Sequence, residues 1–114
     1  MLKKSLRLRT QKDFERVFRK GTPLFFCAFG FRIGKTDLGF LRLGFSLSKK
    51  HLDKAVSRNR VRRIVSAAFL GISQENAQKS LDVVFFTTKK LERKDISTVA
   101  SQAQSVVECI SSKF

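Results

Sequence analysis

Residues 55–70 read AVSRNRVRRIVSAAFL, and this stretch predicts one helix with two very different faces. Its apolar side chains follow the i, i+3, i+4, i+7 spacing of a buried stripe: Val61, Ile64, Val65 and Ala68. At about 100° per residue, the polar side chains fall on the opposite side: Asn59, Arg60, Arg62 and Arg63, with Arg58 nearer the edge in the first turn. Gly71 is expected to end the helix near Leu70. The stripe is expected to be buried in the core.

Three apolar segments around this helix have the composition of strands. Residues 24–33 alternate, which would place Phe25, Cys27, Phe29, Phe31 and Ile33 on one face of a single strand. Residues 41–47 alternate as well, and the turn residues 34–37 between the two segments predict a hairpin. Residues 81–88 are almost continuously apolar, which is typical of a central strand covered on both faces.

Two more helices complete the predicted order. Thr10, with Asp13 three residues later, is a capping-box-like start for a helix over residues 11–20, which Gly21 ends. The last helix is expected over residues 95–112, with a stripe of Ile96, Val99, Ala100, Ala103, Val107 and Ile110. The order α-β-β-α-β-α predicts an α+β fold, a two-layer α/β sandwich with a small mixed sheet, in one domain over residues 1–114.

The charge of the chain is large and unevenly distributed. The formal net charge is +15 over 114 residues. Residues 1–20 contribute +6 and residues 49–63 another +6, so two short segments hold most of the excess. Such an excess repels itself in the folded state, which points to a negatively charged partner.

Arginine is the cation best suited to a phosphate partner, because its planar fork matches phosphate oxygens two at a time and stacks on bases. RNA is therefore the leading candidate partner. A solvated helix face, a DNA-reading helix and a membrane-surface helix are the alternatives. The apolar face is narrow and needed for the core, which disfavours the membrane. The longest uncharged stretch, residues 21–31, is too short to span one.

The sequence does not predict catalysis by the chain itself. Its nine acidic residues are scattered singly, with no pair that spacing brings together, and His51 is the only imidazole. There is no glycine-rich phosphate loop and no zinc-ligand spacing. Cys27 and Cys109 are expected to be buried free thiols, which suits a reducing cytoplasm, and no secretory signal is recognisable.

Two phenylalanines have two open interpretations. Phe14 and Phe18 share the apolar face of the first predicted helix with Val17. They either fill the core or present rings on which unpaired bases stack, since basic side chains flank them.

Two stretches resemble the protein subunit of bacterial ribonuclease P. One is Arg7-Leu8-Arg9 followed by residues 13–21, DFERVFRKG. The other joins residues 43–50, LGFSLSKK, to residues 55–63, AVSRNRVRR, with Ala68-Phe69 after them. The sequence departs from the family at Ser66, where many relatives have a basic residue, and no glycine follows Lys50.

The resemblance implies a left-handed βαβ crossover and a ribonucleoprotein that removes the 5′ leader of precursor tRNA. It implies that the RNA subunit performs the cleavage with Mg²⁺, and that the protein needs no organic cofactor, membrane or protein partner. A ribosomal or other structural RNA-binding protein is the alternative function.

The resemblance also assigns residues to two RNA partners. Binding of the catalytic RNA falls to Lys49, Lys50, Arg58, Asn59, Arg60, Arg62 and Arg63. Binding of the precursor-tRNA leader falls to Phe14, Phe18, Arg9 and Arg16. Relatives often add a strand aromatic to the leader cleft, and the crowded run from Phe25 to Phe31 leaves that assignment open. No catalytic or metal-binding residue is assigned to this chain.

Overall fold

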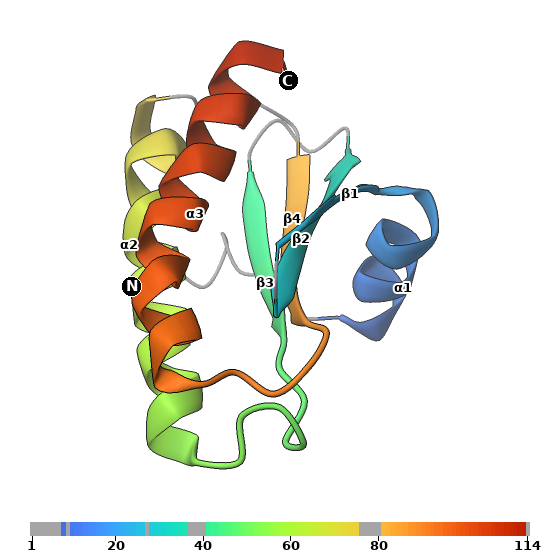
Figure 1. Cartoon of the computed structure of the whole chain (residues 1–114). Coiled ribbons are helices and arrows are strands. Elements are labelled where there is room, and N and C mark those ends of the chain that lie inside the picture. Colours follow the sequence, from blue (N-terminus) through green and yellow to red (C-terminus); the bar gives the residue numbers. More distant parts are fainter. Residues whose placement is uncertain (1–7, 9, 27, 37–40, 76–80, 114) are drawn as a thin grey trace.

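The computed structural model describes residues 8, 10–26, 28–36, 41–75 and 81–113 (Figure 1). The elements are α1 (Gln11–Lys20), β1 (Thr22–Phe25), β2 (Phe29–Lys35), β3 (Arg42–Ser46), α2 (Ala55–Glu75), β4 (Leu81–Thr87) and α3 (Arg93–Lys113). The described strands form one mixed sheet in the order β1-β2-β4-β3. The α+β class and its small mixed sheet are confirmed.

Strand β4 lies inside the sheet, and both of its faces are buried. It pairs antiparallel with β2 and parallel with β3. Val83 and Phe85 point into the main core, whereas Val84 belongs to a smaller cluster on the other face. The prediction of a central strand in this segment is therefore confirmed, since residues 81–86 are all buried.

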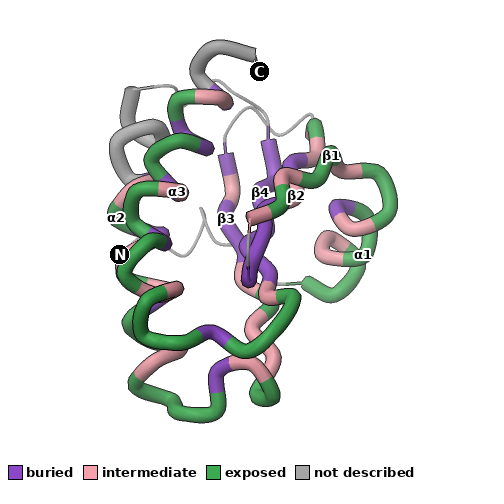
Figure 2. Tube along the Cα trace, viewed as in Figure 1, coloured by how far each residue is buried: buried purple, intermediate pink, exposed green. Residues whose placement is uncertain are grey.

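The helices cover the two faces of the sheet unequally. Helices α2 and α3 lie side by side on one face, and the short α1 lies on the other (Figure 1). The predicted stripe of α2 is buried, with Val61 and Val65 fully enclosed. Figure 2 shows exposed residues along the outer sides of α2 and α3. The predicted two layers are thus the sheet and the long helix pair, with α1 added behind the sheet.

Segment 24–33 forms two strands instead of one. Strands β1 and β2 pair as an antiparallel hairpin, and the amide of Phe26 donates to the carbonyl of Phe29 across the bend (2.8 Å). The predicted face holds within β2, but Phe25 in β1 points away from the core and is 62% exposed.

The hairpin predicted between residues 24–33 and 41–47 is wrong. Strand β4 lies between β2 and β3, because an apolar strand gains most from a central position with helices and strands on every side. The parallel pairing of β3 with β4 makes β3-α2-β4 a crossover unit through a long helix. The left hand of that crossover stays a prediction from the resemblance.

Two helix details also differ from the prediction. Helix α2 continues through Gly71 to Glu75, because a glycine inside a long helix costs only about 1 kcal/mol relative to alanine. In α3 the predicted stripe is buried at Val99, Ala103, Val107 and Ile110, but Ala100 is exposed. Val106 takes part in the core instead.

Candidate nucleic-acid interface

The first half of α2 presents cations to solvent. Val61 and Val65 anchor one face of the helix in the core, so the opposite face points to solvent. Asn59, Arg60 and Arg63 are exposed, and Arg62 is half-buried, donating from Nη1 to Asn59 Oδ1 (3.3 Å). Among the residues that the structure describes, none of the ion pairs includes an arginine of this helix. These side chains are available to bind phosphate.

Arg58 differs from its neighbours on the same helix. Its Nη1 donates to the backbone carbonyls of Leu52 (2.8 Å) and Asp53 (3.2 Å). These bonds tie the connector that precedes α2 to the first helical turn. Arg58 therefore has a structural role in addition to the predicted RNA-binding one.

The connector between β3 and α2 carries Lys49 and Lys50, both exposed, in a turn closed by Ser48. The turn is held against the end of β4: His51 Nδ1 lies 2.8 Å from Thr87 Oγ1, and the amide of Ser48 donates to the same hydroxyl. The lone histidine thus positions the connector next to the sheet. Lys49 and Lys50 lie near the start of α2, as their predicted role requires.

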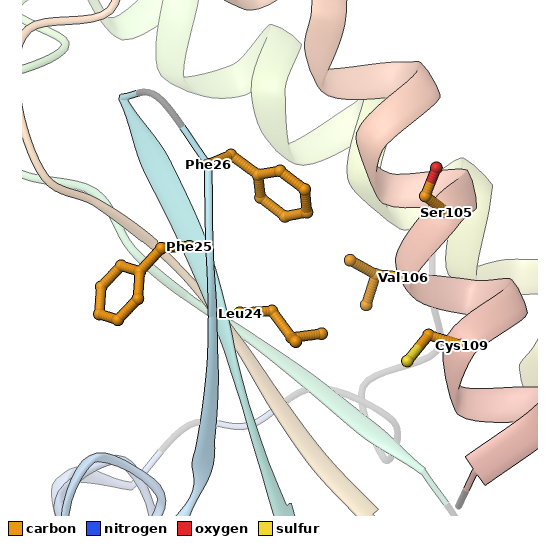
Figure 3. Close-up of a pocket in the computed structure, with 6 residues that line it drawn as sticks. All are labelled: Leu24, Phe25, Phe26, Ser105, Val106 and Cys109. Atoms are coloured by element: carbon orange, nitrogen blue, oxygen red, sulfur yellow. The ribbon is translucent and has the colours of Figure 1, made fainter.

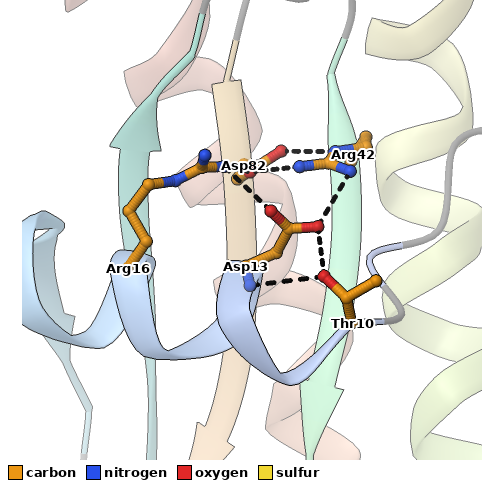
Figure 4. A network of polar contacts seen from close by, with 5 residues as sticks. All are labelled: Thr10, Asp13, Arg16, Arg42 and Asp82. Atoms are coloured by element: carbon orange, nitrogen blue, oxygen red, sulfur yellow. Dashed lines mark hydrogen bonds and ion pairs between the residues drawn. The ribbon is translucent and has the colours of Figure 1, made fainter.

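A second polar site lies where α1 meets the sheet, and it was not predicted (Figure 4). Arg42 of β3 holds Asp82 of β4 with two bonds, Nε to Oδ1 (2.8 Å) and Nη2 to Oδ2 (2.7 Å). Arg16 of α1 reaches the same carboxylate (2.8 Å), and Asp13 of α1 pairs with both arginines (3.3 Å each). Asp13 and Asp82 thus share two arginines, an arrangement that the spacing of the acids in the sequence did not indicate.

Burial makes this network a structural feature of the sheet. The side chain of Asp82 is fully buried and that of Arg42 is 16% exposed. Hydrogen bonding to Asp82 raises the pKa of the Arg42 guanidinium, which stays charged. The Thr10 hydroxyl, which caps α1, hydrogen-bonds the Asp13 carboxyl and, with Arg42, lowers its pKa. The signal in the sequence was Asp82 itself, a lone charge in an otherwise apolar strand.

The network limits the predicted leader-binding role of Arg16. Its side chain is 46% exposed, so it can meet a partner, but its guanidinium is already neutralised by two carboxylates. Arg9, also assigned to the leader, lies outside the described residues. No group of three or more His, Cys, Asp or Glu side chains that could hold a metal occurs within the described ranges.

Phe14 and Phe18 lie on the face of α1 that meets the sheet. Both are half-buried and pack against the cluster of Leu8, Val17 and Val84. The sheet makes room for the Phe14 ring at Gly44, where an added Cβ would lie 2.8 Å from Phe14 Cζ. The core interpretation therefore holds in part, since each ring packs on the sheet. Each ring also keeps an accessible portion, and the base-stacking interpretation stays a prediction.

Strand residues missed by the prediction continue this surface past Phe18. The Phe18 and Phe86 rings meet edge to face (5.8 Å between centroids), and the Arg32 guanidinium lies over both (5.6 and 5.8 Å). Arg32 also donates to the carbonyl of Phe18 (3.1 Å). The exposed Phe25 ring stands edge-on to Phe86 (5.7 Å). The strand aromatics that face α1 are thus Phe25 and Phe86, whereas Phe29 and Phe31 belong to the main core.

An apolar cavity of about 230 Å³ lies on the other side of β1, against α3 (Figure 3). Leu24, Phe26 and Val106 line it together with the free thiol of Cys109. Cys27 lies outside the described residues. None of the described residues that line the cavity is charged, and none belongs to the basic surfaces. No described helix is long and apolar enough to cross a membrane.

Comparison with known proteins places these surfaces in context. The family model for ribonuclease P matches residues 2–111. The ribonuclease P protein component of Clostridium botulinum is 32% identical over 98 residues, which cover 86% of this chain and 87% of that protein.

Solved structures give the same result. The RNase P protein from Thermotoga maritima superposes with a TM-score of 0.71 at 30% identity, covering 90% of this chain and 96% of that one. The Staphylococcus aureus RNase P protein matches in fold with a TM-score of 0.70 at 23% identity, covering 96% and 94%. Because the family model matches nearly the whole sequence and a curated relative is 32% identical over 86% of it, the chain belongs to the ribonuclease P protein family.

Proposed function

We propose that this chain binds the catalytic RNA of ribonuclease P through the outer face of α2 and holds the 5′ leader of precursor tRNA against the α1 side of the sheet. The observation that carries the first part is a row of three arginines, Arg60, Arg62 and Arg63, that form no ion pair within the described part of the chain. They lie on a helix whose other face is buried in the core. A rigid scaffold that presents unpaired guanidiniums is suited to a folded polyanion.

The second part of the proposal is supported by the surface next to α1. The partly accessible rings of Phe14 and Phe18, with Arg32 and Phe25 beside them, combine aromatic faces with a cation. Unpaired bases stack on such surfaces, with a contribution of about 1–3 kcal/mol per base. A single-stranded leader exposes its bases in this way, whereas paired RNA does not.

Chemistry is assigned to the RNA subunit, which would hold the Mg²⁺. The side chains described on this chain fit a magnesium site poorly: Asp13 and Asp82, the carboxylates of the network beside α1, are both engaged by arginine. The ion would polarise the scissile phosphate, and this chain would supply binding and charge neutralisation. The cytoplasm is the proposed location, as expected for tRNA processing.

A reconstitution experiment tests this division of labour. The purified, RNA-free chain should leave precursor tRNA intact at low Mg²⁺, and addition of the catalytic RNA should produce cleavage at the mature 5′ end, mapped by primer extension. Site-specific cleavage by the RNA-free chain would contradict the assignment of chemistry to RNA. So would failure of the chain to stimulate the RNA at low Mg²⁺.

The electrostatic part of the proposal predicts a steep salt dependence. If six to ten phosphates are neutralised, affinity for the catalytic RNA should fall by roughly 10³–10⁵ between 50 and 200 mM salt, on the scale measured for duplex DNA. Filter binding or fluorescence anisotropy across a salt series measures the slope. A flat profile would mean that the partner is not bound through its phosphates.

A further inference from the structure

A basic hollow of about 400 Å³ lies where the connector before α2, the first turns of α2 and the link between β4 and α3 come together. Four cations line it: Lys54, Arg60, Lys90 and Arg93. One acid, Asp53, lies among them, so the formal charge of the lining is +3. Residues 54 and 90 are far apart in sequence, and only the tertiary structure makes them neighbours.

The backbone of the hollow is fixed by contacts beneath it. The amide of Leu91 donates to the carbonyl of His51 (3.0 Å), which joins the β4–α3 link to the connector. Leu52 and Leu91 are buried at 3% and 6% exposure in the main core. Arg58 clamps the connector from the other side through the carbonyls of Leu52 and Asp53. The segments that carry the cations are thus held in place before any partner binds.

The cations of the hollow form no ion pair with any residue that the structure describes. All four residues are exposed. A concave surface lined by one sign of charge concentrates its field and attracts the opposite charge. Because the four cations are exposed and come from separate segments, they suit several phosphates in a row better than one enclosed anion.

We propose that this hollow is a second contact for the catalytic RNA, taking phosphates of a backbone segment that continues from the arginine face of α2. The proposal rests on the proposed function of that face. Arg60 links the two surfaces, since it belongs both to the exposed row of α2 and to the lining of the hollow. The residues added to the interface are Lys54, Lys90 and Arg93.

The decisive variant is the double substitution Lys90→Ala/Arg93→Ala, compared with the charge-matched control Lys12→Ala/Lys35→Ala. Lys12 lies on α1 and Lys35 at the end of β2, both exposed. The affinity of each full-length variant for the catalytic RNA is measured over a salt series. The hollow variant should bind about tenfold more weakly with a salt slope shallower by about 1–2, while the control stays within about twofold of the parent.

Two results would overturn the proposal. One is an unchanged affinity of Lys90→Ala/Arg93→Ala while Arg60→Ala weakens binding, which would confine the interface to α2 and leave the proposed function intact. The other is an equal loss in the hollow variant and the control, which would mean that only total charge matters. If neither Arg60→Ala nor Lys90→Ala/Arg93→Ala changed the affinity for the catalytic RNA, the proposed function itself would be contradicted.

A gain-of-affinity variant provides an independent check. Asp53→Asn removes the one acid in the hollow and leaves its backbone carbonyl free to accept from Arg58. If phosphates enter, binding of the catalytic RNA should tighten by about two- to fivefold, because a repulsive charge is lost. Weaker binding by a variant with an unchanged melting temperature would show that Asp53 attracts a cation, and would overturn the proposal.

Discussion

The two basic surfaces of this protein use arginine in opposite ways. On α2, Arg60 and Arg63 are exposed and take part in none of the described ion pairs. Beside α1, Arg16 and Arg42 are neutralised by Asp13 and Asp82. The arginines of α2 remain available to a partner, whereas those beside α1 hold that helix on the sheet through ion pairs. Density of positive charge in a sequence therefore does not identify the binding cations. Only their partners in the folded chain do.

The largest expected effect is on stability, and it tests the ion pairs that hold α1 on the sheet. Asp82→Asn removes the buried carboxylate that Arg42 and Arg16 share and leaves Arg42 with only its longer pair to Asp13. Breaking a buried ion pair from one side in this way should lower the free energy of unfolding by about 3–5 kcal/mol. Urea denaturation measures it. The control is Glu92→Gln, which breaks an exposed pair with Lys94 (3.7 Å) and should cost less than about 0.5 kcal/mol. Equal losses in both variants would show that the buried network does not fix α1.

A smaller effect is expected where the α1 surface meets the leader. Phe18→Ala should lower the free energy of unfolding by about 1–3 kcal/mol, because the ring is only half-buried. In the holoenzyme it should also weaken binding of precursor tRNA with a long leader, by about 1–3 kcal/mol if one base stacks there. Substrates with a one-nucleotide leader should bind unchanged.

Phe25→Ala separates packing from stacking on the same surface. Phe25 is 62% exposed, so its removal should leave stability nearly unchanged. A loss of long-leader affinity in this variant would extend the surface to β1. If Phe18→Ala lowers stability but leaves the leader-length dependence intact, the Phe18 ring serves the core alone.

The arginines of α2 provide an internal comparison of similar size. Arg60→Ala should weaken binding of the catalytic RNA about tenfold and change stability by no more than about 0.5 kcal/mol. Arg58→Ala should instead lower stability by about 1–2 kcal/mol, because it loses bonds to two backbone carbonyls. Anisotropy titration and urea denaturation of both variants separate the two roles. Identical behaviour of the two would remove the distinction drawn from the structure.

The smallest effect concerns pH. The folded state lowers the pKa of Asp13, chiefly through the Thr10 hydroxyl. A depressed carboxyl pKa stabilises the fold above the unfolded pKa, and that contribution is lost as pH falls through the folded value. Stability should therefore drop below about pH 4, and Asp13→Asn should show a smaller drop over the same range. Parallel pH profiles of the two proteins would show that Asp13 does not contribute.

Much of the fold was predictable because each element carries its own periodicity. The bounds of α1 and the buried stripe of α2 follow from capping residues and helical spacing, and the central position of β4 follows from its continuous apolar run. The split of segment 24–33 and the neighbours of each strand did not follow, because pairing depends on which edges meet in space. Within the site, the outward face of Arg60 was predictable, but the structural role of Arg58 was not.

The sequence by itself determined the faces of the helices, the excess of positive charge and the family, since composition and residue order fix all three. The tertiary structure alone decided which charges stay available. Asp13 and Asp82 are distant in sequence, yet they lie on one pair of arginines because β4 passes between β2 and β3 beneath α1. The same contact that joins His51 to Leu91 brings Lys90 next to Lys54. Electrostatic energy depends on distance in space, which residue order does not contain.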